Sequence, residues 1–456
     1  MKRVNNLYDS MISYSNILYV FNRIKSRCHN KDKLMRFIRY KNCYLMDILI
    51  KLKNNSYVFS NYNIFLIKEN KYRIIMSESI SDKIVNQMVS YFILLPSLKC
   101  LIDSNIATRR GKGSGYGYKL FESYVNKIGG KDIYVLRIDV KKYFYNINHN
   151  ILIGMLEDRI KDKKAISILK KIISLTNYDY VNDSINNLIR NEIRRVSKLN
   201  ISDNEKKRLI NELNSIPLYK YGKGLSIGCL SNQLMGIFYL NNIDHFIKEE
   251  LGCKYYIRYM DDIYILSEDK YYLNKIFKLI VGKLKEIDLD INNKSGIYRL
   301  KEGVSFLGYT YSIKNNKLLV RYDNNTIRKI NRKLNKLKMY NFEFYYRSIS
   351  SYKGYFIRCN THLFIDRYKF LCMGSNYDKY LLIKDRYCKY IVFIKYRDRY
   401  YTYNDDLEYM NDLLRLDSKY FYKREVLILS ECVILDGNKC FIYRRKAIND
   451  RERQLG

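Results

Sequence analysis

The chain has 456 residues, with 83 lysines and arginines against 46 aspartates and glutamates, and a formal net charge of +37. A surplus this large repels itself in a compact protein unless an anion relieves it, and phosphate backbones are the obvious anion. The sequence has no apolar run of ~18 residues and no signal-peptide core after its first residues, so we expect a protein of the cytoplasm without a membrane segment. Ten scattered cysteines without a C-x-x-C spacing, and four histidines, argue against a zinc site.

The first 70 residues mix apolar and basic side chains at helical spacing, which predicts an N-terminal helical region over 1–70. A basic stretch containing Lys71 and Arg73 follows. Four glycines at alternating positions from Gly111 to Gly117 could let backbone N–H groups approach phosphates. The Gly-Lys-Ser/Thr ending of a Walker motif is missing, so this loop does not predict a nucleotide-binding P-loop.

Residues 133–140 form an apolar, β-branched run that predicts a strand carrying Asp139 at its carboxyl end. A segment rich in Lys, Arg, Glu and Asn follows over about 151–221, and it predicts helices that run over the surface. Residues 230–247 then repeat apolar positions at helical spacing, which predicts a buried helix.

The tetrapeptide Tyr259-Met260-Asp261-Asp262 lies between two short apolar runs, which predicts a hairpin with an acidic pair at its connection. Two adjacent carboxylates at the tip of a buried hairpin are costly unless a cation binds them, and Mg²⁺ is the natural candidate. Asp139 could join them if its strand pairs in the same sheet. Two metal ions held by such carboxylates are the machinery of nucleotidyl transfer.

Downstream, residues 329–338 predict a basic helix that could lie along the phosphates of a duplex, or could be a solvated helix face. From about residue 366 the sequence alternates Tyr, Lys, Arg and Asp without a motif. This basic, Tyr-rich C-terminal extension over 366–456 leaves three roles open: RNA binding, an oligomer contact, or a hydroxyl that primes synthesis.

Four motifs in order resemble those of reverse transcriptases. Asp139-Val140-Lys141-Lys142-Tyr143-Phe144 resembles motif A, residues 223–234 resemble motif B, Tyr-Met-Asp-Asp resembles motif C, and residues 303–309, with Gly308 at the turn, resemble the primer grip of motif E. The resemblance covers roughly 71–365. It implies an α+β right-hand polymerase with an antiparallel palm sheet and helical N- and C-terminal additions. The implied parts are fingers over 71–135, a palm over 136–312 with a helical insertion at about 151–221, and a thumb over 313–365.

The resemblance also implies the metal site. Asp139 and Asp261 would be the principal ligands, the Val140 carbonyl would assist, and Asp262 would be a supporting carboxylate, because neighbouring residues on a regular strand face opposite ways. The implied cofactor is a pair of Mg²⁺ ions, with Mn²⁺ as a substitute.

Further residues match the family's substrate-binding positions. Phe144 stands where the family places a steric gate against the 2′-hydroxyl, and a core residue is the alternative. Gln233 would project toward the nascent base pair, and Gly228 would let the chain approach the template closely. Two positions depart from the family pattern, since Ser226 replaces the common Pro and Asn232 replaces the common Ser.

Basic side chains complete the implied substrate contacts. Arg73 is the best candidate for binding the triphosphate, and Lys71 is the second. Lys294 stands where the family's motif D lysine could protonate pyrophosphate, although it could also be a plain surface lysine.

Residues 350–361 resemble the thumb segment of two bacterial groups, the diversity-generating enzymes and the "unknown group" that includes defence-associated reverse transcriptases. Group II intron enzymes are more distant relatives. We therefore expect a bacterial RNA-directed DNA polymerase that copies an associated noncoding RNA in antiphage defence. Its partners would be the RNA template, the DNA product, deoxynucleotides and a second copy of the chain, without a membrane. Diversity-generating, retron-like, untemplated and protein-primed synthesis stay open, whereas an RNA-dependent RNA polymerase and an inactive scaffold are disfavoured.

Overall fold

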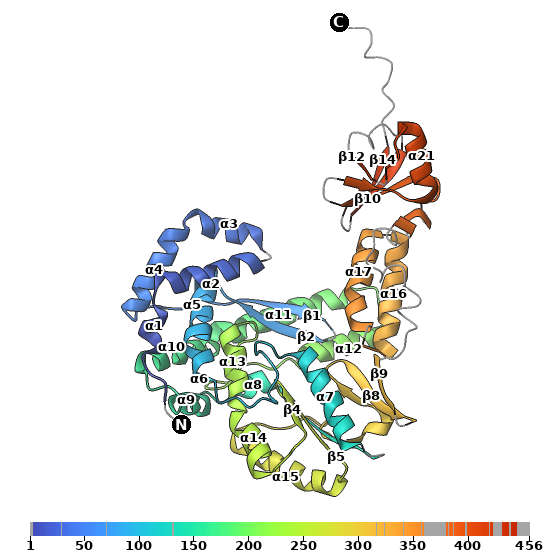
Figure 1. Ribbon diagram of the computed structural model, residues 1–456. Helices are drawn as coiled ribbons and strands as arrows, with labels where there is room; N and C mark the ends of the chain where they lie inside the picture. Colours follow the sequence, from blue (N-terminus) through green and yellow to red (C-terminus); the bar gives the residue numbers. More distant parts are fainter. Residues whose placement is uncertain are drawn as a thin grey trace. The chain divides into compact units, whose positions relative to one another are not determined.

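The computed structural model comprises two compact units, Met1–Leu300 and Lys301–Gly456. Figure 1 shows their elements in chain order. The residues described are 3–28, 30–69, 71–129, 132–315, 317–322, 324–340, 342–356, 358–359, 380–381, 383–385, 387–396, 399–418, 420–422, 431–436 and 439–444. The end of the predicted thumb resemblance, at Asn360 and Thr361, lies outside them. Among the described residues, no helix is both long enough and apolar enough to span a membrane.

Helices open the first unit, as the spacing of apolar residues predicts. They are α1 (Leu7–Met11), α2 (Tyr14–Arg27), α3 (Lys31–Arg39) and α4 (Lys41–Lys53). Side-chain caps start two of them, because Ser13 accepts from the Asn16 N–H and Asn30 accepts from the Lys33 N–H. The helical region ends at Lys53, and strand β1 begins at Asn63, where aromatic and β-branched residues take over.

A two-stranded antiparallel hairpin of β1 (Asn63–Lys68) and β2 (Tyr72–Ser77) follows. The helices of the 151–221 insertion are α9 (His149–Glu157), α10 (Lys163–Ile173), α11 (Asp179–Ser197) and α12 (Asp203–Asn214). Of these, α11 and α12 support the hairpin. The Tyr72 N–H donates to Glu212 Oε1 at 2.8 Å, and Leu66 packs with Ile189. The insertion is helical as predicted, yet it also buttresses the hairpin that carries Arg73.

The palm sheet is fully antiparallel, in the order β4-β5-β3-β6. Its strands are β3 (Tyr134–Asp139), β4 (Tyr256–Tyr259), β5 (Asp262–Ser267) and β6 (Gly296–Arg299). The surrounding helices are α5 (Ile80–Val89), α6 (Leu95–Ser97), α7 (Ser114–Ile128), α8 (Tyr143–Asn146), α13 (Leu230–Tyr239), α14 (Asn241–His245) and α15 (Lys270–Glu286), with π-helical turns at Ser90–Leu94 and Phe246–Glu250 and 3-10 turns at Ser174–Asn177 and Leu300–Glu302. Fully buried apolar residues of the sheet and helices share one core, which fixes the strand ends. The mixed α+β class and the antiparallel palm sheet are confirmed.

The second unit begins with a three-stranded antiparallel sheet of β7 (Val304–Phe306), β8 (Tyr309–Lys314) and β9 (Lys317–Tyr322). Gly308, with φ 90°, makes its first turn. Helices α16 (Asn324–Tyr340) and α17 (Phe342–Phe356) follow, and they share a small core that includes Leu334 and Ile349.

The C-terminal extension contains a five-stranded sheet in the order β12-β11-β10-β13-β14. Its elements are β10 (Ile391–Tyr396), β11 (Arg399–Tyr401), α21 (Asn404–Leu414), β12 (Tyr420–Tyr422), β13 (Glu431–Asp436) and β14 (Lys439–Arg444). The C-terminal addition, which the resemblance implied to be helical, contains this five-stranded sheet as well as α21. Short β-branched runs such as Ile391–Tyr396 form strands here because β10 pairs in parallel with β13, a distant contact that local spacing does not reveal.

Candidate active site

The strand ends of the palm sheet bring the predicted carboxylates together. Strand β3 pairs with β5 so that Asp139 is directly opposite Asp262, at the last position of the register. Side chains opposite each other on antiparallel strands have Cβ atoms roughly 4.5–5.5 Å apart. Asp261 lies in the adjoining two-residue turn between β4 and β5. Residues separated by more than a hundred positions therefore lie together at one end of the sheet.

Met260 gives the acidic turn its shape, and a buried arginine binds its carbonyl. Its φ is 56°, a left-handed conformation that is strained for a residue with a side chain. The Arg258 guanidinium donates to the Met260 carbonyl at 2.7 Å. Arg258 is in turn held by both Asp244 oxygens at 2.6 Å, and both side chains are fully buried. This buried pair fixes the backbone from which Asp261 projects.

The charges of the three carboxylates repel one another. Burial, followed by the neighbouring charge of Asp262 and then by that of Asp139, raises the pKa of Asp261 to about 7. Burial also raises the pKa of Asp262, with Asp139 adding to the effect and Arg137 opposing it. Arg137 is two positions before Asp139 on β3, and its guanidinium lies 3.4 Å from Asp262 Oδ1. One partly exposed arginine does not neutralise three acids, so the site favours an added cation.

The loop over residues 292–295, just before β6, forms hydrogen bonds to the main chain and side chain of Asp139. The Asn292 N–H donates to the Asp139 carbonyl at 2.7 Å, and the Asn292 amide donates to Asp139 Oδ2 at 3.3 Å. The Asp139 N–H donates to Ser295 Oγ at 3.0 Å. Lys294 belongs to this loop and is exposed. Val140 is buried and bridges to Ile291 in the same region.

The motif B segment is tied to motif A and to the β1–β2 hairpin. The Leu225 N–H donates to the Phe144 carbonyl at 2.7 Å, and the Met76 N–H donates to the Ile227 carbonyl at 3.0 Å. At Gly228, φ is 137°, and a Cβ would lie 2.5 Å from the Met76 carbonyl oxygen. A side chain at position 228 would therefore clash with the backbone of β2, which explains the glycine. That Gly228 also lets the chain approach a template stays a prediction.

The two departures from the family pattern contact each other. The Asn232 amide donates to Ser226 Oγ at 2.7 Å, and the Ser226 hydroxyl donates to the Tyr62 hydroxyl at 3.1 Å. Both Ser226 and Asn232 are buried. Ser226 and Asn232 thus form a matched pair that orders the segment before α13, whose first turn carries the half-buried Gln233.

Phe144 packs against the palm helix at Gly236, where an added Cβ would lie 3.2 Å from the ring. The ring is half-buried, so it is neither a free surface group nor a fully enclosed core residue. On β2, Arg73 is exposed between the buried residues Tyr72 and Ile74, and Lys71 is exposed just before the strand. The structure does not join Arg73 or Lys71 to the carboxylates by any direct contact among the described residues.

The donor set fits a divalent cation, although no cage is preformed. In the described part of the chain, no three His, Cys, Asp or Glu side chains are already gathered in a metal-binding geometry. Mg²⁺ commonly takes only one or two carboxylates and completes its shell with water and substrate phosphates, so such a cage is not needed. Asp139 and Asp261 have the chemistry for this.

Sequence reasoning missed Arg258, Asp244, Arg137 and Asn292, which position the carboxylates. One signal was available, because Arg258 is a charged residue in an otherwise apolar strand directly before the acidic turn. A charge in a buried strand indicates a buried partner. The partner itself lies on α14, which the sequence does not identify.

Two comparisons with known proteins agree with this geometry. Residues 66–311, more than half of the chain, match the family described as "Reverse transcriptase (RNA-dependent DNA polymerase)". The chain is also 27% identical over 204 residues to the "Putative COX1/OXI3 intron 2 protein" of Saccharomyces cerevisiae (strain ATCC 204508 / S288c). That similarity covers 39% of this chain and 24% of the yeast protein, about a quarter of its length. With the family match spanning the paired strand ends and their acidic turn, the chain belongs to the reverse transcriptase family.

Proposed function

We propose that this protein is an RNA-directed DNA polymerase that adds deoxynucleotides to a primer by nucleotidyl transfer. The observation that supports it most is the cross-strand pair of Asp139 and Asp262 with Asp261 in the adjoining turn. Carboxylates that repel one another cost stability, and a binding protein has no use for them. They gain their counter-charge when divalent cations arrive with a triphosphate. The partners are then an RNA template, a DNA product and deoxynucleotides.

Divalent metal ions serve reverse transcriptases in general, and for this chain we propose two Mg²⁺ ions, which Mn²⁺ can replace. When bound, they would activate the primer hydroxyl and neutralise the leaving pyrophosphate. Asp139 and Asp261 would be the principal ligands, helped by the Val140 carbonyl. Asp262 would be a supporting carboxylate, because Arg137 lies 3.4 Å from one of its oxygens.

The remaining substrate contacts follow from the family positions. Arg73, with Lys71 as the second candidate, would bind the triphosphate from the exposed face of β2. Gln233 and Gly228 would contact the nascent base pair, and Lys294 would protonate pyrophosphate from the loop that holds Asp139.

Phe144 would be the steric gate that rejects ribonucleotides. Its ring rests on the backbone of α13 at Gly236, so it has no room to retreat from a 2′-hydroxyl in that direction. We expect Phe144→Ala to lower the preference for dNTP over NTP roughly tenfold or more, whereas Phe144→Tyr keeps the bulk and the preference. Single-nucleotide incorporation with each substrate measures this. An unchanged preference in Phe144→Ala would assign the ring to the core instead.

For the biological setting, we propose a bacterial cytoplasmic enzyme of the defence-associated group that copies an associated noncoding RNA and assembles as an oligomer of identical chains. A second candidate is an intron-linked enzyme, which the name of the yeast relative favours. The same site could also serve diversity-generating, retron-like, untemplated or protein-primed synthesis.

The test is labelled-nucleotide incorporation by protein purified with its co-bound nucleic acid, beside an Asp261→Ala/Asp262→Ala control. The four deoxynucleotides are supplied singly and together, with and without RNase treatment. Incorporation that needs Mg²⁺, the carboxylates and intact RNA supports the proposal, and sequencing the RNA identifies the template. RNase-resistant incorporation would indicate untemplated synthesis. Retained RNA without any incorporation would contradict a polymerase function.

A further inference from the structure

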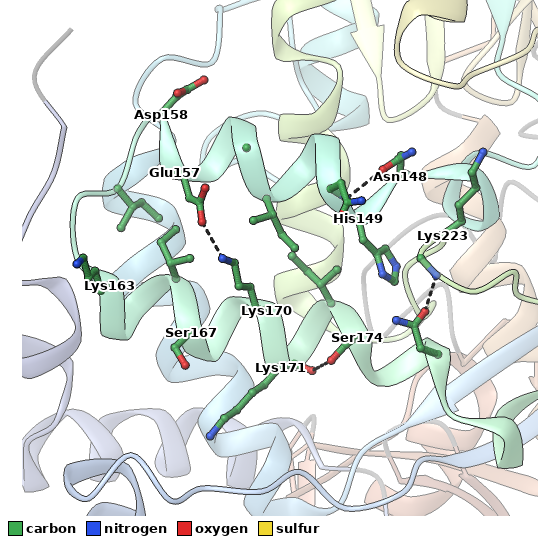
Figure 2. A pocket seen from close by; sticks show the side chains of 18 of the residues that line it. Asn148, His149, Glu157, Asp158, Lys163, Ser167, Lys170, Lys171, Ser174 and Lys223 are labelled. Carbon is green, nitrogen blue, oxygen red and sulfur yellow. Dashed lines mark hydrogen bonds and ion pairs between the residues drawn. The ribbon is translucent and has the colours of Figure 1, made fainter.

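A long groove separates α9 from α10 in the helical insertion, with a volume of ≈ 1330 Å³. We call it the α9–α10 groove. Figure 2 shows it from close by, with side chains of both helices along its sides. Isoleucines such as Ile153 and Ile166 line its interior, and Gly154 leaves it wide because nothing lies within 4 Å of a Cβ built there.

Basic side chains dominate the lining. Six are basic and two, Glu157 and Asp158, are acidic; the basic ones are Arg3, Lys161, Lys163, Lys170, Lys171 and Lys223. Lys170 forms an ion pair with Glu157 at 2.8 Å across the groove, and both side chains are about half exposed. In the described part of the chain, no carboxylate lies within ion-pair distance of Lys163. Arg3 pairs with Asp158 at 3.9 Å, and Lys223 pairs with Asp288 at 3.2 Å. The positive surplus of the groove therefore comes from Lys161, Lys163 and Lys171, and it attracts phosphate.

One face of α10 presents hydrogen-bond donors to this groove at regular intervals. Lys163, Ser167 and Lys170 follow at spacings of four and three residues, and all three line the groove. At 1.5 Å per residue, the two lysines are ~10 Å apart along the helix, so they can contact different phosphates of one strand.

An exposed aromatic ring also lines the groove. Tyr221 is 89% exposed and is followed by Gly222 in a left-handed turn. An exposed tyrosine beside basic residues is a stacking platform for an unpaired base. Nearby, His149 Nε2 lies 2.7 Å from the Gly224 carbonyl, so the groove ends against the motif B segment.

We infer that the α9–α10 groove binds single-stranded RNA, with phosphates on the lysines of α10 and a base stacked on Tyr221. Amides and hydroxyls along the groove, including Asn150, Ser167 and Asn177, suit the ribose hydroxyls that distinguish RNA from DNA. The inference rests on the proposed function only for the choice of RNA as the nucleic acid. The site itself is separate from the carboxylates and does not need catalysis.

The test is the affinity of the full-length protein, stripped of nucleic acid, for a labelled unstructured 12-nucleotide RNA over a range of salt. We expect Lys163→Gln/Lys170→Gln to weaken binding about tenfold and to lower the salt slope by ~1.4, because two phosphate contacts are lost. Lys275→Gln/Lys278→Gln is the matched control, since it removes the same charge from the exposed face of α15. It should leave affinity within about twofold.

Two variants separate the groove from general attraction by charge. Gly154→Gln fills the groove without changing charge and is favourable in a helix, so we expect a similar loss of affinity. Glu157→Gln releases Lys170 and should tighten binding about threefold. Equal affinities of wild type and Gly154→Gln, or equal losses in the two double lysine variants, would overturn the inference. So would displacement of the RNA by poly-glutamate as effective as displacement by unlabelled RNA.

Incorporation on a preannealed primer–template separates this inference from the proposed polymerase. Groove variants should keep single-nucleotide incorporation at saturating primer–template, whereas Asp261→Ala/Asp262→Ala should lose it and keep RNA binding. Loss of incorporation in every groove variant, with unchanged RNA affinity, would contradict the inference and leave the polymerase assignment standing.

Discussion

The acidic strand ends of the palm and the buried Asp406 of α21 hold carboxylates in opposite surroundings. Asp406, 4% exposed, accepts from Lys384 at 2.6 Å, from the Tyr380 hydroxyl at 2.9 Å and from the Val392 N–H at 3.0 Å. Asp261, by contrast, is crowded by two other acids, and its pKa is raised to about 7. Asp406 therefore has a counter-charge and hydrogen-bond donors within its own unit. Asp261 has neighbouring negative charges that oppose its ionisation.

This contrast separates structural from functional acids. A satisfied carboxylate fixes local structure, as Asp406 fixes the junction of β10 and α21 and as Asp244 fixes Arg258. A set of carboxylates that repel one another lowers the stability of the fold, and proteins keep such sets mainly where function requires them. The comparison predicts that the two kinds of acid respond oppositely to substitution.

The largest effect is expected from Asp261→Asn. It removes a proposed metal ligand, so nucleotide incorporation should fall about 10³-fold, which corresponds to ~4 kcal/mol of transition-state stabilisation. RNA affinity should stay nearly unchanged because the substitution removes no positive charge. Primer extension and RNA titration measure the two quantities. Incorporation at the wild-type rate would remove Asp261 from the catalytic set.

Asp406→Asn should do the reverse. It leaves Lys384 without its anion and should destabilise the second unit by roughly 3 kcal/mol, while incorporation per folded molecule stays the same. Hydrogen exchange of the β10 and β13 amides measures the stability. Undiminished protection of those amides would show that the satisfied carboxylate contributes little.

Replacing the Arg258–Asp244 ion pair tests whether this buried pair affects catalysis by positioning the turn that carries Asp261. In Arg258→Met/Asp244→Leu both buried charges disappear, so folding should survive, but the Met260 carbonyl loses its donor. We expect kcat to fall roughly 10–100-fold with little change in the KM for deoxynucleotide, because the turn is mispositioned. A purely structural role would leave kcat of the folded protein intact.

The smallest effect concerns stability against pH. Because the folded-state pKa of Asp261 is raised from 3.8 to about 7, its ionisation costs stability progressively as pH rises from about 4 through 7. Without metal, Asp261→Asn should therefore melt roughly 2 °C higher than wild type at pH 8, and no higher at pH 4. Thermal melts with and without Mg²⁺ measure this, and Mg²⁺ should erase the gain. A gain that is equal at both pH values would argue against the charge repulsion.

Much of the site could be predicted from local patterns. Alternation and β-branching place Asp139 at the end of a strand, and the apolar flanks place Asp261 and Asp262 at a hairpin connection. The helical insertion also follows from spacing. These features can be predicted because strand and helix formation depends on the spacing of apolar residues that are close in sequence.

Only the tertiary structure decided what surrounds those residues. It paired Asp139 with Asp262, placed Arg258 on Asp244, joined Ser226 to Asn232 and set β10 beside β13. It also opened the α9–α10 groove, which no motif marks. Each of these contacts joins separate elements, so its free energy depends on register and packing rather than on local sequence. The sequence thus determined the chemistry that this protein carries, and the packing of its elements decided which groups meet.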